Sequence, residues 1–303
     1  MKRRHFLTQS LATSAVLNAN AKKIFSPQKT NLQVFVLGTS WGFEGSIDTF
    51  CQKIKSEGYD GIEVWWPAKE NDQKKLFDAL QKHQLQVGFL CAGSDSNFQI
   101  HEKQFKEAIL AAVGNPYQKP LYINCHSGKD FFSFEQNSQL ITFTIEQEAK
   151  TGIEILHETH RGRMCFAAHI TRIFLEKHEK MKLTLDISHW TNVHESMLDN
   201  QTETVDVALK KVAHIHARIG HEQGPQVNDP RAPEWKYTLE KHLKWWDKAV
   251  ENREKYGAKS ITFLTEFGPP NYLATLPFTN QPVANQWEIN VHMLKLIKDR
   301  YKK

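Results

Sequence analysis

The sequence predicts an α/β protein whose eight parallel strands close into a single-domain (β/α)8 barrel, a TIM barrel. In residues 32–303, short apolar segments alternate eight times with longer amphipathic ones, and the eight pairs occupy about 270 residues. Such alternation indicates a parallel sheet, and a barrel of eight units typically takes about 250 residues. A doubly wound open sheet is the alternative, but residues 38–42 lack the glycine-rich phosphate turn expected after its first strand.

Each strand is predicted from a short apolar run that is bounded by polar residues or glycine. In chain order these runs are Leu32–Gly38, Gly61–Trp66, Gln86–Cys91, Leu121–His126, Gly152–Glu158, Lys182–Ile187, Val212–Ile219 and Ser260–Glu266.

Each helix is predicted from a longer charged segment with apolar residues at helical spacing, such as the stripe of Leu76, Phe77 and Leu80. The last segment ends on Lys and Arg, which helix C-termini favour. In chain order the segments are Ile47–Glu57, Asn71–His83, Glu102–Val113, Glu135–Lys150, Phe166–Lys180, Thr202–Lys211, Glu234–Tyr256 and Asn285–Tyr301.

Residues 1–21 resemble a twin-arginine signal peptide. They contain Arg-Arg-x-Phe-Leu at positions 3–7, a weakly apolar stretch and the small-x-small sequence Ala19-Asn20-Ala21. The alternative is that these residues begin an ordinary basic helix that is not cleaved from the protein. Residues 22–31 are interpreted as a linker, so the catalytic barrel is expected over residues 32–303. We therefore expect the mature protein to be periplasmic or otherwise exported.

Charge and composition argue against several classes of partner. The formal net charge is +5, and cleavage after Ala21 would remove three basic residues and no acidic ones, which leaves +2. We expect no nucleic-acid binding, because that depends on neutralising phosphates. No apolar run reaches the roughly 18 residues of a membrane span, so no membrane association is expected after signal cleavage. The four cysteines lack the spacing of a metal site or a redox pair and are expected to be buried. Whether any two of them form a disulfide is left open.

Ionisable residues gather where the predicted strands end, which is where a barrel builds its active site. Carboxylates and imidazoles that converge on one barrel mouth indicate a divalent-metal site. We predict one ligand from each of four strands: Glu158, Asp186, His216 and Glu266. Three oxygens and one nitrogen favour Mn²⁺ or Mg²⁺, and Zn²⁺ or Co²⁺ would also fit.

Side chains alternate along a strand, and this refines the prediction for the seventh strand. Val212, His214, His216 and Arg218 are expected to share one face. If that face points into the barrel, His216 lies near the mouth and His214 lies one layer lower. His216 is therefore preferred as the ligand.

Alternation also suggests roles for neighbours of the ligands. His157 and His160 flank Glu158, and we expect both to face a helix or a loop instead of the mouth. Trp65 and Trp66 are equally suited to stacking on a sugar ring and to packing between barrel and helices.

Five ordered motifs together resemble the xylose-isomerase-like barrel family, over about residues 32–301. They are Gly58–Glu63, Glu158-Thr159-His160, Asp186-x-x-His189, His214-x-His216 and Glu266. The family contains sugar and sugar-phosphate isomerases and epimerases and inosose dehydratases. The resemblance implies one divalent metal at the four predicted ligands, with His189 beside them or on the substrate.

The sequence departs from the family pattern after the seventh strand, where Ala217-Arg218 replaces a Lys-Asp or similar pair. The export signal also makes a sugar phosphate an unsuitable substrate, because phosphorylated sugars are intracellular. We therefore expect a free sugar, a keto-sugar or a glycoside, and the oligomeric state is left open.

The family resemblance implies chemistry through an enediolate, formed when a proton leaves the carbon beside a carbonyl. Glu158 and Glu266 are predicted to act as acid or base groups as well as ligands. The candidate substrate-binding residues are Glu63, His126, His189 and Arg218.

We therefore expect a metal-dependent sugar isomerase or epimerase. A lyase or dehydratase acting on keto-sugars or 3-keto-glycosides is the main alternative, because one enediolate serves both outcomes. A sugar-binding module and an endonuclease with three zinc ions are less favoured, the latter because it requires a basic groove.

Overall fold

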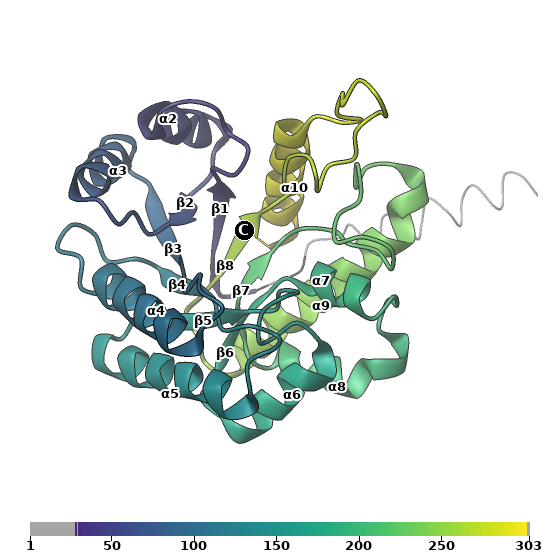
Figure 1. Ribbon diagram of the computed structural model, residues 1–303. Helices are drawn as coiled ribbons and strands as arrows, with labels where there is room; N and C mark the ends of the chain where they lie inside the picture. Colours follow the sequence, from purple (N-terminus) through teal and green to yellow (C-terminus); the bar gives the residue numbers. More distant parts are fainter. Residues whose placement is uncertain (1–27, 29, 302–303) are drawn as a thin grey trace, which may run out of the picture.

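The computed structural model describes residues 28 and 30–301 of the 303-residue chain. It confirms the closed (β/α)8 barrel, whose parallel strands neighbour one another in chain order from β1 to β8 before β8 pairs with β1. Figure 1 shows the strands at the centre and the helices around them. The predicted signal peptide, residues 1–21, lies outside the described residues, as does most of the predicted linker.

All predicted strands and helices are present, with ends that shift by up to four residues. The strands are β1 (Gln33–Thr39), β2 (Gly61–Trp65), β3 (Gln86–Ala92), β4 (Tyr122–His126), β5 (Glu154–Glu158), β6 (Lys182–Leu185), β7 (Val212–His216) and β8 (Ser260–Thr265). The helices are α2 (Ile47–Glu57), α3 (Glu70–His83), α4 (Phe98–Val113), α5 (Phe134–Thr151), α6 (Ala168–Lys177), α7 (Ile187–Val193), α8 (Thr202–Leu209), α9 (Lys236–Lys255) and α10 (Gln286–Tyr301), with short 3₁₀ turns at Asp199–Gln201 and Pro233–Trp235.

The end of β6 differs from the prediction. The strand stops at Leu185, and the short helix α7 begins immediately afterwards. Asp186 is the N-cap of this helix, and its carboxylate accepts a hydrogen bond from the backbone N–H of Ser188. Aspartate is a favoured N-cap, so a residue that we predicted as part of a strand instead starts a helix.

The start of β7 also differs from the prediction. The β6–β7 register shifts between Val212 and His214, so Ala213 occupies a bulge. Val212 then packs in the outer core, whereas Ala213 packs inside the barrel. A bulge resets the alternation of side chains, which is why Val212 does not share the face of His214.

Two apolar layers support the barrel. A large cluster between strands and helices includes Trp245 and Trp246 of α9. Inside the barrel a small plug is made of Leu37, Tyr122, Leu156, Ala213 and Leu264. Gly88 makes room for this plug, because a Cβ there would lie 2.4 Å from the Tyr122 ring. The plug forms the floor on which the polar residues of the barrel mouth rest.

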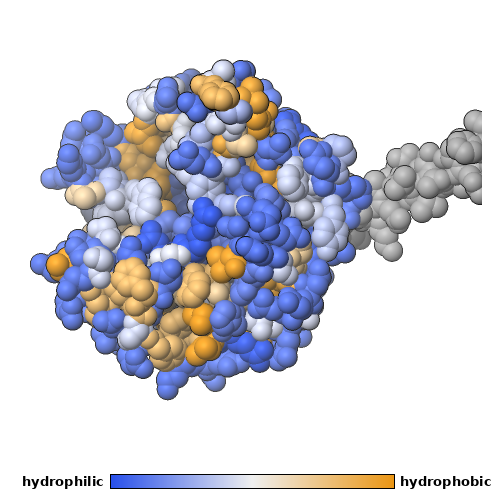
Figure 2. Space-filling model, turned by 45° about the vertical axis from the view of Figure 1, so that its right-hand side comes forward, coloured by the Kyte–Doolittle hydropathy of each residue, from blue (hydrophilic) through white to orange (hydrophobic). Residues whose placement is uncertain are grey.

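The described surface is mostly hydrophilic on the face that Figure 2 shows, and its hydrophobic atoms form separate patches. Within the described residues, no helix combines the length and the hydrophobicity needed to cross a membrane. All four cysteines are buried, as expected, and they are free, which answers the open question of a disulfide. Burial raises the pKa of the Cys51 thiol to about 12, which makes it a poor nucleophile.

His242 on α9 predicts a pH dependence of stability. Its Nδ1 donates to the Thr238 carbonyl at 2.9 Å, and its Nε2 accepts from the Gly220 N–H at 3.2 Å. Burial lowers the pKa of His242 to about 4, because the protonated ring would lose its hydration, and the hydrogen bond to Thr238 opposes this only in part. The unfolded chain, with a pKa of about 6.5, then binds the proton more readily. The stabilising effect is therefore complete above pH 6.5 and is lost as the pH falls toward 4.

We expect the free energy of unfolding to fall by about 3 kcal/mol more in the unmodified protein than in His242→Gln between pH 7 and pH 4. Urea denaturation of both proteins across this range measures the difference. Equal pH slopes would contradict the assignment of a buried neutral imidazole.

Candidate active site

A cavity of about 330 Å³ opens at the C-terminal ends of the strands. It is lined by Thr39, Ser40, Trp41, Glu63, Val64, Trp65, Leu90, His126, Glu158, His160, Arg218, Glu266 and Tyr272. This is the end of the barrel at which TIM-barrel enzymes place their catalytic residues.

Glu158 ends β5 and is almost fully buried. Its Oε2 accepts a hydrogen bond from Asn124 Nδ2 at 2.9 Å and lies 3.0 Å from His126 Nε2. Its Oε1 lies 3.6 Å from His216 Nδ1. Burial would raise the pKa of Glu158, but the charges of His126 and His216 hold it well below its ordinary value. The carboxylate is therefore held in place from several sides of the barrel.

Asp186 is fully buried between α7 and the residues after β7. Its Oδ2 accepts a close hydrogen bond from Arg218 Nη2, and its Oδ1 accepts one from the Ser188 hydroxyl. Burial raises the pKa of Asp186 to about 6, against the opposing effect of the Arg218 charge. Arg218 Nη2 also lies 3.5 Å from Glu266 Oε2, so this guanidinium contacts two of the four predicted ligands.

His216 lies among carboxylates from three other strands or strand ends. Its Nδ1 is 2.9 Å from Glu266 Oε2, and its Nε2 is 3.5 Å from Glu63 Oε1. Burial alone would lower the pKa of His216, but the charges of Glu266, Glu158 and Glu63 raise it well above its ordinary value. A metal ion bound here would therefore have to displace a proton from this imidazole.

One ligand atom from each of the four predicted ligands lies within 4.8 Å of the others, so the structure brings Glu158, Asp186, His216 and Glu266 together. Within the described residues, the buried atoms His216 Nδ1 and Glu266 Oε2 face each other at 2.9 Å and have no other hydrogen-bond partner. Oxygen and imidazole donors that converge in this way fit a divalent cation. Arg218 neutralises only part of the charge of the carboxylates around it, which also favours a cation.

Two smaller groups of residues with metal-ligand chemistry overlap this site. Glu63, His214 and His216 form one, and His126, Glu158 and His160 form the other. Each contributes three donors, whereas the four-residue group contributes four. His214 also lies beneath His216 as predicted: its ring stacks on Tyr122 of the plug, with 4.1 Å between ring centroids.

The predicted substrate-binding residues divide into two sets. Glu63, His126 and Arg218 line the cavity. His189 does not line it, because α7 turns the ring behind the wall, where its Nε2 lies 2.9 Å from Arg218 Nη2. We therefore assign His189 to the positioning of Arg218 instead of substrate contact.

His160 corrects our expectation that it faces away from the mouth. It lines the cavity, and its ring lies 4.8 Å from that of His126 and 3.9 Å from that of His189, centroid to centroid. Residues two apart share a face, so alternation places His160 on the side of Glu158. His157 does face outward, where it contacts Thr144 of α5 and Ser127.

Several site residues had no role in the sequence prediction. Asn124 contacts Glu158 and lies 3.2 Å from His216 Nε2, and Tyr122 donates to Glu63 Oε2 at 2.9 Å. Both share the inward face of β4 with His126. Side chains alternate along a strand, so their spacing of two and four residues from His126 is the signal that could have identified them. Tyr272, from the loop after β8, packs 4.8 Å from the Arg218 guanidinium.

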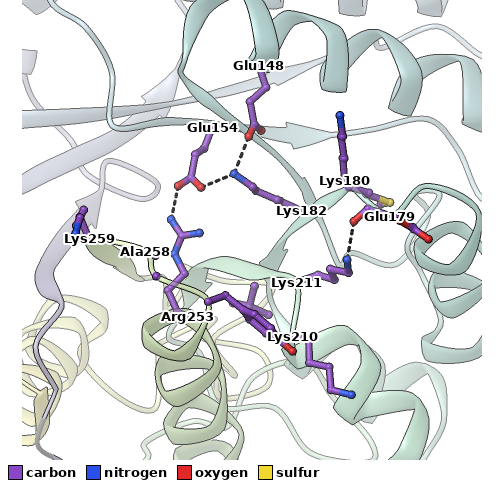
Figure 3. A pocket seen from close by; sticks show the side chains of 14 residues that line it. Glu148, Glu154, Glu179, Lys180, Lys182, Lys210, Lys211, Arg253, Ala258 and Lys259 are labelled. Carbon is purple, nitrogen blue, oxygen red and sulfur yellow. Dashed lines mark hydrogen bonds and ion pairs between the residues drawn. The ribbon is translucent and has the colours of Figure 1, made fainter.

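A larger cavity, of about 740 Å³, lies at the opposite end of the barrel, where β5, β6 and β7 begin. Figure 3 shows Lys182 there between Glu148 and Glu154, with Arg253 on the other side of Glu154. These ion pairs tie the strand starts to α5 and α9. At this end of a TIM barrel, such contacts serve stability instead of catalysis.

Asn124→Ala is expected to weaken divalent-metal affinity by about 10- to 100-fold, because Asn124 orients Glu158 and contacts His216. Titration of the metal-free protein with Mn²⁺ in a calorimeter measures the change. Asn252→Ala, which alters a buried asparagine on α9, is the matched control. Equal affinities in the two variants would contradict a positioning role for Asn124.

No protein-family model matches the chain, and no curated protein sequence matches it. The fold does match solved structures. One is a 3-keto-D-glucoside 4-epimerase from E. coli, at 12% identity and a TM-score of 0.58, over 88% of this chain and 99% of that one. Another is a probable 3-DHS dehydratase involved in petrobactin synthesis from Bacillus anthracis, at 16% identity and a TM-score of 0.56, over 88% and 100%.

A third match is a xylose isomerase-like TIM barrel protein from Mycobacterium smegmatis in complex with magnesium. Its identity is 10% and its TM-score is 0.57, over 87% of this chain and 96% of that one. These matches bear out, at the level of the fold, the resemblance seen in the sequence. The chain therefore has the fold of the xylose isomerase-like TIM barrels.

Proposed function

We propose that the protein is a divalent-metal-dependent isomerase or epimerase that acts on a neutral sugar or keto-sugar through an enediolate. The observation that carries the proposal is the convergence of Glu158, Asp186, His216 and Glu266 at the barrel mouth. The solved structures that share the fold include a 3-keto-D-glucoside 4-epimerase, which supports the proposal, and a probable dehydratase.

Two of these four residues, Glu158 and Glu266, also line the cavity. They end β5 and follow β8, so their carboxylates enter the cavity from different sides of the barrel. One carboxylate can remove a proton from the carbon beside a carbonyl, and the other can return it. Return to the opposite face of the same carbon gives an epimer, and return to the neighbouring carbon gives an isomer.

Asp186 and His216 lie behind the cavity wall, where they complete the proposed ligand set. A divalent ion held by the four residues would act as a Lewis acid on the substrate carbonyl. Mn²⁺ or Mg²⁺ is favoured, and Zn²⁺ or Co²⁺ would also fit the donors. Arg218 contributes a fixed positive charge at the cavity wall, and His126 holds Glu158 in place.

The cavity favours a neutral substrate over a sugar phosphate. Arg218 is the one lysine or arginine among the described residues that line it. Its guanidinium is already paired with Asp186, so the described lining offers no free lysine or arginine side chain to a phosphate group.

A lyase or dehydratase is the second candidate. His126 lines the cavity next to Glu158, and an imidazolium there can give its proton to a departing hydroxyl or alkoxide. Loss of a substituent from the enediolate would then compete with return of the proton.

Incubation of the metal-loaded protein with keto-sugars and 3-keto-glycosides in D₂O tests the proposal. We expect deuterium at the carbon beside the carbonyl, detected by NMR, together with an epimer or isomer. An eliminated product in place of the epimer would support the lyase. Absence of exchange with every keto-sugar and keto-glycoside would contradict both.

We also propose that residues 1–21 direct export by the twin-arginine route. Fractionation of cells that express the full chain measures this. Periplasmic protein that starts after Ala21 is expected, and Arg3→Lys with Arg4→Lys should keep the protein in the cytoplasm. Export that is indifferent to both substitutions would contradict the proposal.

A further inference from the structure

We propose that a second cavity beside the catalytic one binds a neutral ring that is joined through a glycosidic bond to the reacting sugar. The inference rests on the proposed function and narrows its substrate class. The substrate would be a glycoside, with the reacting unit in the catalytic cavity and its substituent in this adjoining site.

The adjoining site has a volume of about 710 Å³ and lies along α2 and α3, the two helices at the upper left of Figure 1. Three residues line both cavities: Ser40, Val64 and Trp65. The two cavities are therefore neighbours with a common wall. The catalytic cavity, at about 330 Å³, is near the lower limit for small-molecule sites. A substrate larger than one sugar would therefore extend into the adjoining site.

Trp65 is the most conspicuous residue of the common wall. Its side chain is 54% exposed, whereas the next residue, Trp66, packs against Phe89 of the core. The Trp65 ring meets His126 edge to face, with 5.3 Å between the centroids. An indole held at a cavity wall offers a flat apolar surface on which a pyranose or an aromatic ring can stack.

The charges along the adjoining site are already paired. Lys82 binds Asp48 at 2.9 Å, Lys74 binds Asp78 at 2.7 Å, and Lys75 lies 3.9 Å from Asp72. An ionic ligand would have to break one of these pairs. A neutral ligand would not, so the pairing favours a neutral occupant.

The remaining wall is apolar, with Ile47, Pro67, Leu76 and Ala79 in addition to Trp65. Ser40 and Ser46 also line the site and add polar groups to this wall. This combination suits a ring with an apolar face and a few hydroxyl groups. A second pyranose and an aromatic aglycone both have that chemistry.

Calorimetric titration, over a period in which NMR detects no conversion of the ligand, tests the inference without turnover. The probes are glucose, cellobiose and phenyl glucopyranoside. We expect cellobiose or phenyl glucopyranoside to bind at least about tenfold more tightly than glucose, because either ring gains contact with Trp65. A preference for cellobiose would identify a sugar as the occupant, and a preference for the phenyl glycoside would identify an aromatic aglycone.

Two neighbouring substitutions on α3 provide a matched pair. Lys75 is exposed and lines the adjoining site, whereas Lys74 is exposed and does not line it. Lys75→Trp should fill the site and remove the preference for the larger ligand, with glucose binding unchanged. Lys74→Trp should leave the preference intact. The inference is overturned if neither glycoside binds more tightly than glucose, or if both variants lose the preference equally.

The experiment also separates this inference from the proposed function. If no keto-sugar exchanges its proton but Lys75→Trp abolishes glycoside preference, the site stands and the proposed reaction fails. If keto-sugars turn over but monosaccharides and glycosides bind alike, the reaction stands and the site fails.

Discussion

Glu158→Gln is expected to lower kcat for proton exchange at the carbon beside the substrate carbonyl by at least about 100-fold. Glu158 lines the catalytic cavity, and its Oε2 is held by Asn124 at 2.9 Å and lies 3.0 Å from His126. Glutamine has nearly the same shape but cannot take up the proton. Deuterium incorporation at saturating metal, followed by NMR, measures the rate.

Saturating metal is required because the substitution also weakens a proposed metal ligand. Metal content measured on the same samples separates loss of the ion from loss of the proton acceptor. Glu179→Gln is the matched control, since Glu179 lines the cavity at the opposite end of the barrel. An exchange rate in metal-loaded Glu158→Gln equal to that of the control would contradict an acid–base role for Glu158.

Glu266→Gln is expected to weaken divalent-metal affinity by at least about 100-fold, more than the loss of a residue that merely orients a ligand. Glu266 Oε2 is buried and lies 2.9 Å from His216 Nδ1 and 3.5 Å from Arg218 Nη2. The substitution removes one charged donor of the proposed set. Titration of metal-free protein with Mn²⁺ measures the affinity.

Asp186→Ala provides an independent test of the same ligand set. Its carboxylate also pairs with Arg218, so its loss leaves a buried guanidinium close to the metal position. We expect a loss of affinity at least as large as in Glu266→Gln. Retention of a full metal equivalent in both variants would contradict the assignment.

The fold could be predicted because its signals are repeated along the whole chain. Apolar runs and amphipathic segments alternate eight times, so small errors in where each predicted strand or helix ends did not affect the predicted architecture. The two differences in the strands both arise from local geometry. Asp186 caps a helix where an apolar run continues, and the bulge at Ala213 interrupts an apparently regular strand. Neither event interrupts the hydrophobic pattern on which the prediction was based.

The candidate ligands could be placed together because each ends a strand or follows one directly, and all strands of a barrel end at one mouth. Contacts between side chains were harder to predict. The pairing of Arg218 with Asp186 joins residues 32 positions apart, and it depends on how α7 turns after β6. Asn124 and Tyr122 carry no charge, so a search for charged strand ends passes over them. The site beside Trp65 is formed by α2, α3, the end of β2 and the loops after β1 and β2, and their packing has no signature in the sequence.

Elemental analysis of the purified mature protein, with no metal added, tests the proposed metal centre directly. The convergence of Glu158, Asp186, His216 and Glu266 predicts about one Mn, Co, Zn or Mg per chain, lost on chelation. Near three zinc ions per chain would contradict a single-metal sugar enzyme and favour a nuclease. No metal, even after each ion has been supplied, would contradict the metal centre itself and leave the four side chains as a network stabilised by Arg218.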